Sequence, residues 1–206
     1  MVLALEALRR LQEGNGRFVS GVRSLETLMS QTRRGDLVGG QTPFAVILGC
    51  SDSRVPVEMI FDQGLGDLFV IRVAGNIVAP SQVGSVEFAA AQFGTRLVVV
   101  LGHTGCGAVQ ATLAELQRSS ETQSPHLRSI VDRIRPAVAG LLETELRHDP
   151  YALAHHAVRA NVRMSANYLR HGSQILEQLA EQDGLLVVGA EYSLETGVVE
   201  FFDGVE

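Results

Sequence analysis

The chain has 206 residues, with 17 basic residues that are all arginine, 23 acidic residues and a formal net charge of −6. Without lysine it has no Schiff-base lysine, P-loop lysine or lysine general base, and its acidic balance argues against a nucleic-acid-binding protein. Apolar residues make up 46% of a length typical of one domain, which is enough for a packed core.

The N-terminus lacks the basic and apolar regions of a secretory signal, and no apolar run approaches the ~20 residues of a membrane span. We therefore expect a cytoplasmic protein without a membrane partner. In a reducing compartment its two cysteines, Cys50 and Cys106, are expected to be free, catalytic or metal-binding rather than disulfide-bonded.

Residues 1–34 are predicted to form an N-terminal arm of two amphipathic helices. Leucine and methionine recur at helical spacing in both, as Leu5, Leu8 and Leu11 and then as Leu25, Leu28 and Met29. The run Gly14-Asn15-Gly16 is predicted to end the first helix.

Four short apolar runs are predicted to be strands buried on both faces: 44–48, 68–71, 97–101 and 185–188. Helical stretches separate them: 83–93, 108–116 and a block over 126–181, which Pro136 and Pro150 divide into two or three helices. This alternation predicts an α/β fold with a mostly parallel central sheet of about four strands flanked by helices, in a single domain over 1–206. Residues 198–202 are predicted to add an antiparallel edge strand through a hairpin.

Two predicted strands run into loops rich in reactive side chains. Cys50 follows the first strand, and His103 and Cys106 follow the third. The carboxyl ends of parallel strands meet at one edge of a sheet, so these three side chains are expected to lie together. Two thiols and an imidazole with a fourth position open are typical of a catalytic zinc site. The alternative, buried cysteines and a capping histidine, explains each residue alone but not their joint placement.

Asp52 and Arg54 follow Cys50 at alternating positions, so an extended segment would point all three side chains to one side. An arginine neighbour lowers the pKa of an aspartate, which would keep Asp52 ionised beside the metal as a hydrogen-bond acceptor or as a ligand. The alternative is a surface ion pair of little energetic worth.

Other features of the sequence are weaker. The run Gly105-Cys106-Gly107 would either cradle an anion on its N–H groups or simply form a tight turn, and Gly75-Asn76 predicts a loop with positive φ. The remaining histidines are expected to be solvated or satisfied in the core rather than to bind metal: His126, His148, His155, His156 and His171.

The segments Cys50-Ser51-Asp52-Ser53-Arg54-Val55 and Gly102-His103-Thr104-Gly105-Cys106-Gly107 resemble the paired signature of the β-class carbonic anhydrases, and the likeness is dense over 41–109. The resemblance implies one zinc ion per subunit, held by Cys50, His103 and Cys106. It implies reversible hydration of carbon dioxide to bicarbonate and a proton by zinc-bound hydroxide, which an Asp52–Arg54 dyad orients. Two thiolate ligands predict a less acidic zinc-bound water, and so activity that rises above neutral pH.

The resemblance also implies a homodimer or higher even oligomer with active sites at the interface. The implied substrate-binding residues are Gln41, Phe69, Ala74, Phe88 and Gly107, and the glutamine and the apolar wall come largely from the neighbouring subunit. Phe88 and Gln92 stand where some plant members carry tyrosine and histidine linked to proton export, so buffer is expected to carry the proton away. Ile47 stands where members with an inhibitory bicarbonate site carry tryptophan, which predicts a plant-like, open site.

Three other functions stay open on the sequence. The same zinc site would serve a carbonyl sulfide or carbon disulfide hydrolase, or a non-catalytic zinc-binding member of the family. A redox protein using both cysteines is a further alternative, although the usual Cys-x-x-Cys spacing is missing.

Overall fold

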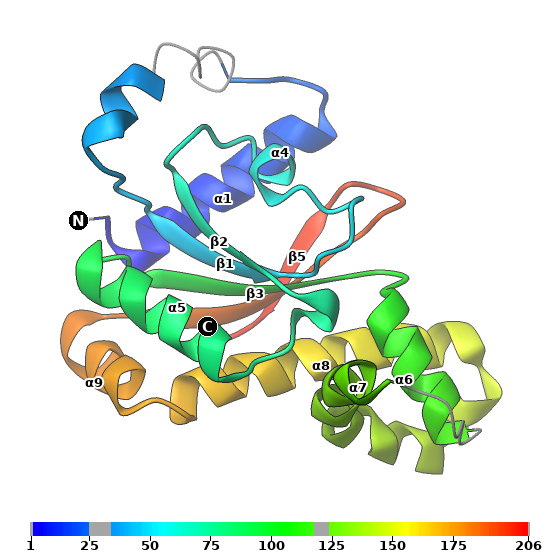
Figure 1. Ribbon diagram of the computed structural model, residues 1–206. Helices are drawn as coiled ribbons and strands as arrows, with labels where there is room; N and C mark the ends of the chain where they lie inside the picture. The colour runs from blue at the N-terminus through cyan, green and yellow to red at the C-terminus, as the bar shows by residue number, and fades with distance from the viewer. Residues whose placement is uncertain (1, 25–33, 118–123, 206) are drawn as a thin grey trace.

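The computed structural model describes residues 2–24, 34–117 and 124–205. At its centre is a five-stranded sheet in the order β2–β1–β3–β4–β5 (Figure 1). The strands are β1 (Ala45–Gly49), β2 (Leu68–Arg72), β3 (Leu97–His103), β4 (Leu186–Tyr192) and β5 (Val199–Asp203). The first four are parallel and β5 is antiparallel to β4, so the predicted α/β class and its antiparallel edge strand are confirmed.

Helices cover both faces of this sheet (Figure 1). The α-helices are α1 (Ala4–Val19), α4 (Val57–Ile60), α5 (Pro80–Gln92), α6 (Gly107–Gln117), α7 (Pro125–Val138), α8 (Pro150–His171) and α9 (Gln174–Asp183). Short 3-10 turns are η1 (Leu37–Gly39), η2 (Ala74–Asn76), η3 (Ala139–Glu143) and η4 (Glu145–His148).

Alternate residues of the buried strands face two different helix layers, as the pleat of a strand requires. On β1, Ile47 packs in one cluster with α1 and α4, and its neighbour Leu48 packs in a second cluster with α5, α8 and α9. A third cluster, formed with α6, α7 and α8, contains Cys50 and Cys106. The carboxyl ends of β1 and β3 therefore open into a separate apolar region of the core.

The prediction that the first helix ends at Gly14-Asn15-Gly16 is wrong, because α1 continues through these residues to Val19. Gly14 lies against α4, where a Cβ would collide with the backbone carbonyl of Phe61. The glycine thus serves close packing rather than chain reversal. The Asn15 side chain is buried and donates to the carbonyls of Ile60 and Gly197, at 3.2 and 2.9 Å.

The C-terminal helical block contains three α-helices, the upper of the two numbers expected. Pro136 does not interrupt α7 where it stands, since the helix runs two residues further to Val138. Asp149 and Pro150 do form a boundary, at which Asp149 caps α8 by accepting from the N–H groups of Tyr151 and Ala152. The predicted second N-terminal helix lies mainly outside the described residues. Over the described ranges, no helix has the length and apolarity to cross a membrane.

Candidate active site

The candidate site is built where β1 and β3 end side by side. The two strands pair in parallel with Gly49 opposite Leu101, so Cys50 and His103 emerge at the same edge of the sheet. Cys106 follows three residues after His103, immediately before α6 begins at Gly107. Gly105, with φ +67°, reverses the chain between them, a conformation that glycine adopts without steric cost.

Cys50, His103 and Cys106 form a compact, buried cluster. Their sulfur and ring-nitrogen atoms all lie within 4.8 Å of one another, and the two Sγ atoms are 4.0 Å apart. The three residues are 5%, 0% and 1% exposed. No other group of metal-ligating side chains of this kind occurs over 2–24, 34–117 and 124–205.

The His103 imidazole is held by one nitrogen and leaves the other without a hydrogen bond. Its Nδ1 lies 3.0 Å from the carbonyl oxygen of Thr104, which fixes Nδ1 as the protonated nitrogen. Its Nε2 is buried and has no hydrogen-bond partner among the residues described. A buried nitrogen left unpaired in this way costs free energy unless a ligand occupies its lone pair.

The two thiols of the cluster titrate together. The hydrogen bond from Cys106 lowers the pKa of Cys50, and the nearby imidazole of His103 adds to this effect. The same hydrogen bond, together with burial, raises the pKa of Cys106. The contact between the two sulfurs thus makes one thiol easier to ionise than the other, and binding of a cation to both would release their protons.

Asp52 lies at the edge of the cluster and is paired with Arg54. Its Oδ2 is 3.8 Å from His103 Nε2 and 2.7 Å from Arg54 Nη2, while its Oδ1 accepts from Arg54 Nε at 2.9 Å. The expected extended segment is wrong, because the backbone turns here and the Val55 N–H donates to the Asp52 carbonyl. The turn, rather than strand alternation, brings the two side chains together.

Residues that sequence reasoning missed support the loop after β1. Arg72, the last residue of β2, donates from Nε to the Cys50 carbonyl at 2.9 Å and from Nη2 to the Asp52 carbonyl at 2.5 Å. The Gly75 N–H donates to Cys50 Sγ at 3.4 Å. A cation directly after the apolar run 68–71 was the available signal for Arg72, although that run forms an edge strand only partly buried rather than one buried on both faces. The predicted positive φ is confirmed at Gly75 and Asn76, at +70° and +42°.

The implied substrate-binding residues lie on several different elements of the chain. Gly107 and Ala74 lie beside it in sequence, next to Cys106 and Gly75. Phe69 and Phe88 pack against each other with ring centroids 6.2 Å apart, and Phe88 is 52% exposed. Gln41 is exposed and lies nine positions before Cys50, at the amino end of β1, whereas Cys50 follows its carboxyl end.

Comparison with known proteins assigns the chain to a protein family. A family model described as carbonic anhydrase matches residues 45–199. "Carbonic anhydrase 2" of Mycobacterium tuberculosis is 41% identical over 192 residues, which cover 93% of this chain and 89% of that protein. The carbonic anhydrase of Mycolicibacterium smegmatis is 39% identical, covering 94% of this chain and 91% of that protein. The chain belongs to the β-class carbonic anhydrase family.

Solved structures of β-carbonic anhydrases share its architecture. CafA of Aspergillus fumigatus matches with a TM-score of 0.75 and 27% identity, covering 86% of this chain and 85% of that one. A tetrameric β-carbonic anhydrase of Sordaria macrospora matches with a TM-score of 0.76 over 95% and 96% of the two chains; its 23% identity supports the fold alone. As a carbonic anhydrase, the chain is a lyase of the carbonate dehydratase type, and the predicted enzyme class is confirmed.

The cluster of this β-class carbonic anhydrase fits zinc by its donor set and spacing. Thiolate and imidazole are the ligands that zinc prefers, and two sulfurs on one tetrahedral zinc ion lie about 3.8 Å apart. The observed separation of 4.0 Å agrees with that value. The unpaired Nε2 of His103 supplies the third donor. The five remaining histidines are all exposed, and none belongs to the cluster.

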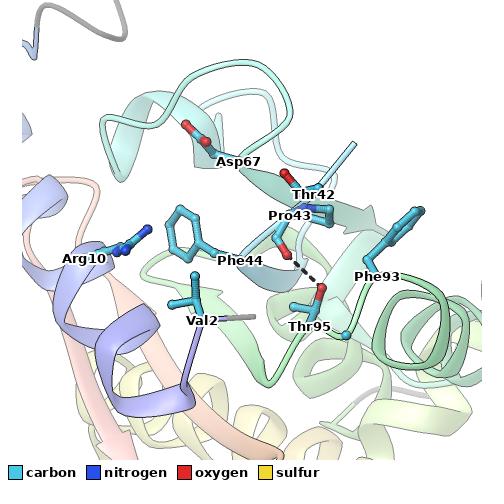
Figure 2. A pocket seen from close by; sticks show the side chains of 9 residues that line it. Val2, Arg10, Thr42, Pro43, Phe44, Asp67, Phe93 and Thr95 are labelled. Atoms are coloured by element: carbon cyan, nitrogen blue, oxygen red, sulfur yellow. Dashed lines mark hydrogen bonds between the residues drawn. The ribbon is translucent and has the colours of Figure 1, made fainter. Parts of the chain in front are cut away.

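A hollow of about 360 Å³ lies at the other end of the strands from the cluster, by the amino ends of β1, β2 and β3 (Figure 2). The Thr95 hydroxyl donates to the Pro43 carbonyl at 2.9 Å, and the Arg10 guanidinium lies 5.6 Å from the centre of the Phe44 ring. None of the candidate site residues lines this hollow. The strands themselves separate it from the cysteine–histidine cluster.

Proposed function

We propose that Cys50, His103 and Cys106 bind one zinc ion per subunit, and that the chain thereby interconverts carbon dioxide with bicarbonate and a proton. The observation that carries this proposal is the buried, unpaired His103 Nε2 beside two thiols. When bound, zinc supplies a water that is acidic enough to lose a proton near neutral pH. Burial of the three side chains keeps bulk water from competing for their lone pairs.

Asp52 orients the reacting water, and Arg54 orients Asp52. The hydrogen bonds from Arg54 hold the pKa of Asp52 well below its usual range, so the carboxylate accepts hydrogen bonds but does not donate them. An acceptor at this position selects a water or hydroxide that has a proton to donate, and disfavours ligands that lack one. The Thr104 carbonyl has a matching role, since it fixes the tautomer and the ring orientation of His103.

Carbon dioxide is apolar, so it needs a dry surface beside the reacting water. We assign that surface to Phe69, Ala74 and Phe88, and its polar contacts to Gln41 and the N–H of Gly107. As the first residue of α6, Gly107 has an N–H without a partner inside the helix. Gln41 precedes the amino end of β1 whereas the cluster follows its carboxyl end, and Phe88 is 52% exposed. Both observations support the supply of these side chains to the site of a neighbouring subunit, in a cytoplasmic homodimer or a higher even oligomer.

The test is stopped-flow carbon dioxide hydration by the purified protein, with metal analysis of the same sample. We expect one zinc ion per chain and catalysis that a chelator abolishes and added zinc restores. Protein that is fully loaded with zinc and inactive in both directions would contradict the activity. Active protein without bound metal would contradict the assignment of the cluster.

A further inference from the structure

Two buried polar side chains interrupt the apolar face of α8, which lies under the sheet (Figure 1). Asn161 and Ser165 are 1% and 4% exposed and lie one helical turn apart. Their neighbours on the same face are core residues: Val158, Val162, Ala166 and Leu169. Polar groups in such surroundings cost free energy unless they are hydrogen-bonded, so each must have a specific partner.

Both partners lie in η2, the turn that follows β2. Asn161 donates from Nδ2 to the carbonyl of Gly75 at 2.8 Å, and the Ser165 hydroxyl donates to the carbonyl of Asn76 at 3.0 Å. These two acceptors are consecutive and both residues have positive φ, a conformation that glycine adopts freely and asparagine more readily than most other residues. The helix therefore holds this left-handed turn through two side-chain hydrogen bonds.

The other side of this turn contacts the cluster. The Gly75 N–H donates to Cys50 Sγ at 3.4 Å. A Cβ on Gly75 would lie 2.7 Å from Ile134 Cδ1 and 3.1 Å from Ala108 Cβ, so α6 and α7 limit the turn from the remaining directions. With the carbonyls of Gly75 and Asn76 held by α8 and the Cα of Gly75 confined by α6 and α7, the turn is fixed with the Gly75 N–H directed at Cys50 Sγ.

We propose that Asn161 and Ser165 are positioning residues that aim the Gly75 N–H at Cys50 Sγ and so reduce the electron donation of that thiolate to a bound metal. The inference rests on the proposed zinc function of the cluster. A hydrogen bond to a thiolate ligand draws electron density away from sulfur, and outer-shell partners of this kind tune the metal. The effect opposes the charge neutralisation by two thiolates and makes the reacting water a stronger acid.

The experiment uses cobalt(II)-substituted protein, because thiolate-to-cobalt charge transfer reports the electron density on sulfur. We compare the wild type with Asn161→Ala and Ser165→Ala, and with Asn167→Ala as an exposed control on the same helix. We expect the charge-transfer band to move to longer wavelength in the first two variants only.

A pH–rate profile adds a second readout, in which the rise of activity should move to higher pH in Asn161→Ala and Ser165→Ala. A folded Asn161→Ala protein with an unchanged band and an unchanged profile overturns the inference. If Asn161→Ala does not fold, Ser165→Ala decides by the same two measurements. A wild-type protein without any thiolate-to-cobalt band overturns the proposed metal site itself, so the two failures are distinguishable.

Discussion

Arg54 hydrogen-bonds both carboxylate oxygens of Asp52, with Nε 2.9 Å from Oδ1 and Nη2 2.7 Å from Oδ2. Its backbone N–H adds a third bond to Oδ1, at 3.0 Å. The side-chain hydrogen bonds dominate in holding the pKa of Asp52 well below its usual range. The carboxylate is therefore ionised across the neutral pH range, and its Oδ2 stays near the unpaired nitrogen of His103.

Asp52→Asn should keep the metal and lose most of the turnover. The amide presents an N–H where the carboxylate accepts, so it no longer orients a water that has protons to donate. We expect kcat/KM for carbon dioxide hydration to fall by about 10–100-fold, with zinc content unchanged. Asp132→Asn is the matched control, since Asp132 pairs with Arg135 on the surface of α7. Full activity in Asp52→Asn would refute the role of the dyad.

Cys106→Ser should lose zinc. The chain has only two cysteines, and a hydroxyl is a much poorer zinc ligand than a thiolate. Metal analysis after dialysis should show less than one zinc per chain, and thermal unfolding should no longer respond to added zinc. His126→Ala, which removes an exposed histidine on α7, should retain the metal. A stoichiometric zinc content in Cys106→Ser would mean that the metal lies elsewhere.

Subunit mixing tests whether Gln41 serves the neighbouring site. Homodimers of Gln41→Ala and of Asp52→Asn should each be weakly active. Dimers that combine one subunit of each kind contain one site with both native residues. After statistical reassembly half of the dimers are mixed, and one of the two sites in each mixed dimer is intact. About one quarter of wild-type activity should therefore be restored. No gain on mixing, with exchange verified by mass spectrometry, would place both residues in the same subunit's site.

Glu191, on β4, predicts a pH dependence of stability. It is 5% exposed, and burial raises its pKa although His155 Nε2 and Arg159 Nη1 lie 3.4 and 3.6 Å from Oε2. The folded state then binds the proton more tightly than the unfolded state, so this group lowers the free energy of unfolding as pH rises above the unfolded pKa. In urea unfolding, the free energy of unfolding of Glu191→Gln should rise relative to that of the wild type between about pH 4 and pH 7.

Glu200, opposite Glu191 on β5, is the control with the opposite sign. Its hydrogen bonds with Arg159 lower its pKa, so its contribution to stability is present above the unfolded pKa and lost as pH falls. The free energy of unfolding of Glu200→Gln should therefore fall relative to that of the wild type over the same rise in pH. The same pH trend in both variants would contradict the assigned burial effect.

Asn15→Ala should destabilise the fold although no site residue is touched. The side chain donates to the carbonyls of Ile60 and Gly197, and its oxygen accepts from the Val199 N–H at 2.8 Å. Each buried group left unpaired costs about 1–3 kcal/mol, so we expect at least about 2 kcal/mol. In a chain of this size that lowers Tm by about 4–8 °C. The exposed Gln12→Ala on the same helix should leave Tm unchanged within about 1–2 °C.

The strands could be predicted from the sequence because a strand buried on both faces is apolar at consecutive positions. Runs such as 97–101 must be apolar at every position, and no tertiary information is needed to recognise that. The end of α1 was not readable. Gly14-Asn15 looks like a helix stop, and only the packing of α1 against α4 and the β4–β5 turn turns this pair into an internal contact point.

Asn161 and Ser165 illustrate the same limit in the site. Two polar residues on the apolar face of a helix are a visible anomaly, yet their acceptors lie 86 and 89 positions earlier in the chain. Arg72 likewise reaches the carbonyl of Cys50 across neighbouring strands. Contacts from a side chain to a backbone carbonyl depend on the order of the strands and the conformation of the loops. No local pattern of residues in the sequence reveals either of these.

The fold class, the family and the members of the cysteine–histidine set could be recognised from the sequence, because apolar strands and short ligand motifs are local in the chain. Three-dimensional packing was needed to show that Asp52 meets Arg54 through a turn, and that His103 keeps one nitrogen unpaired. It also decided that α8 holds the turn beneath Cys50. These are directions in space, which the fold sets by packing helices and strands that are far apart in sequence.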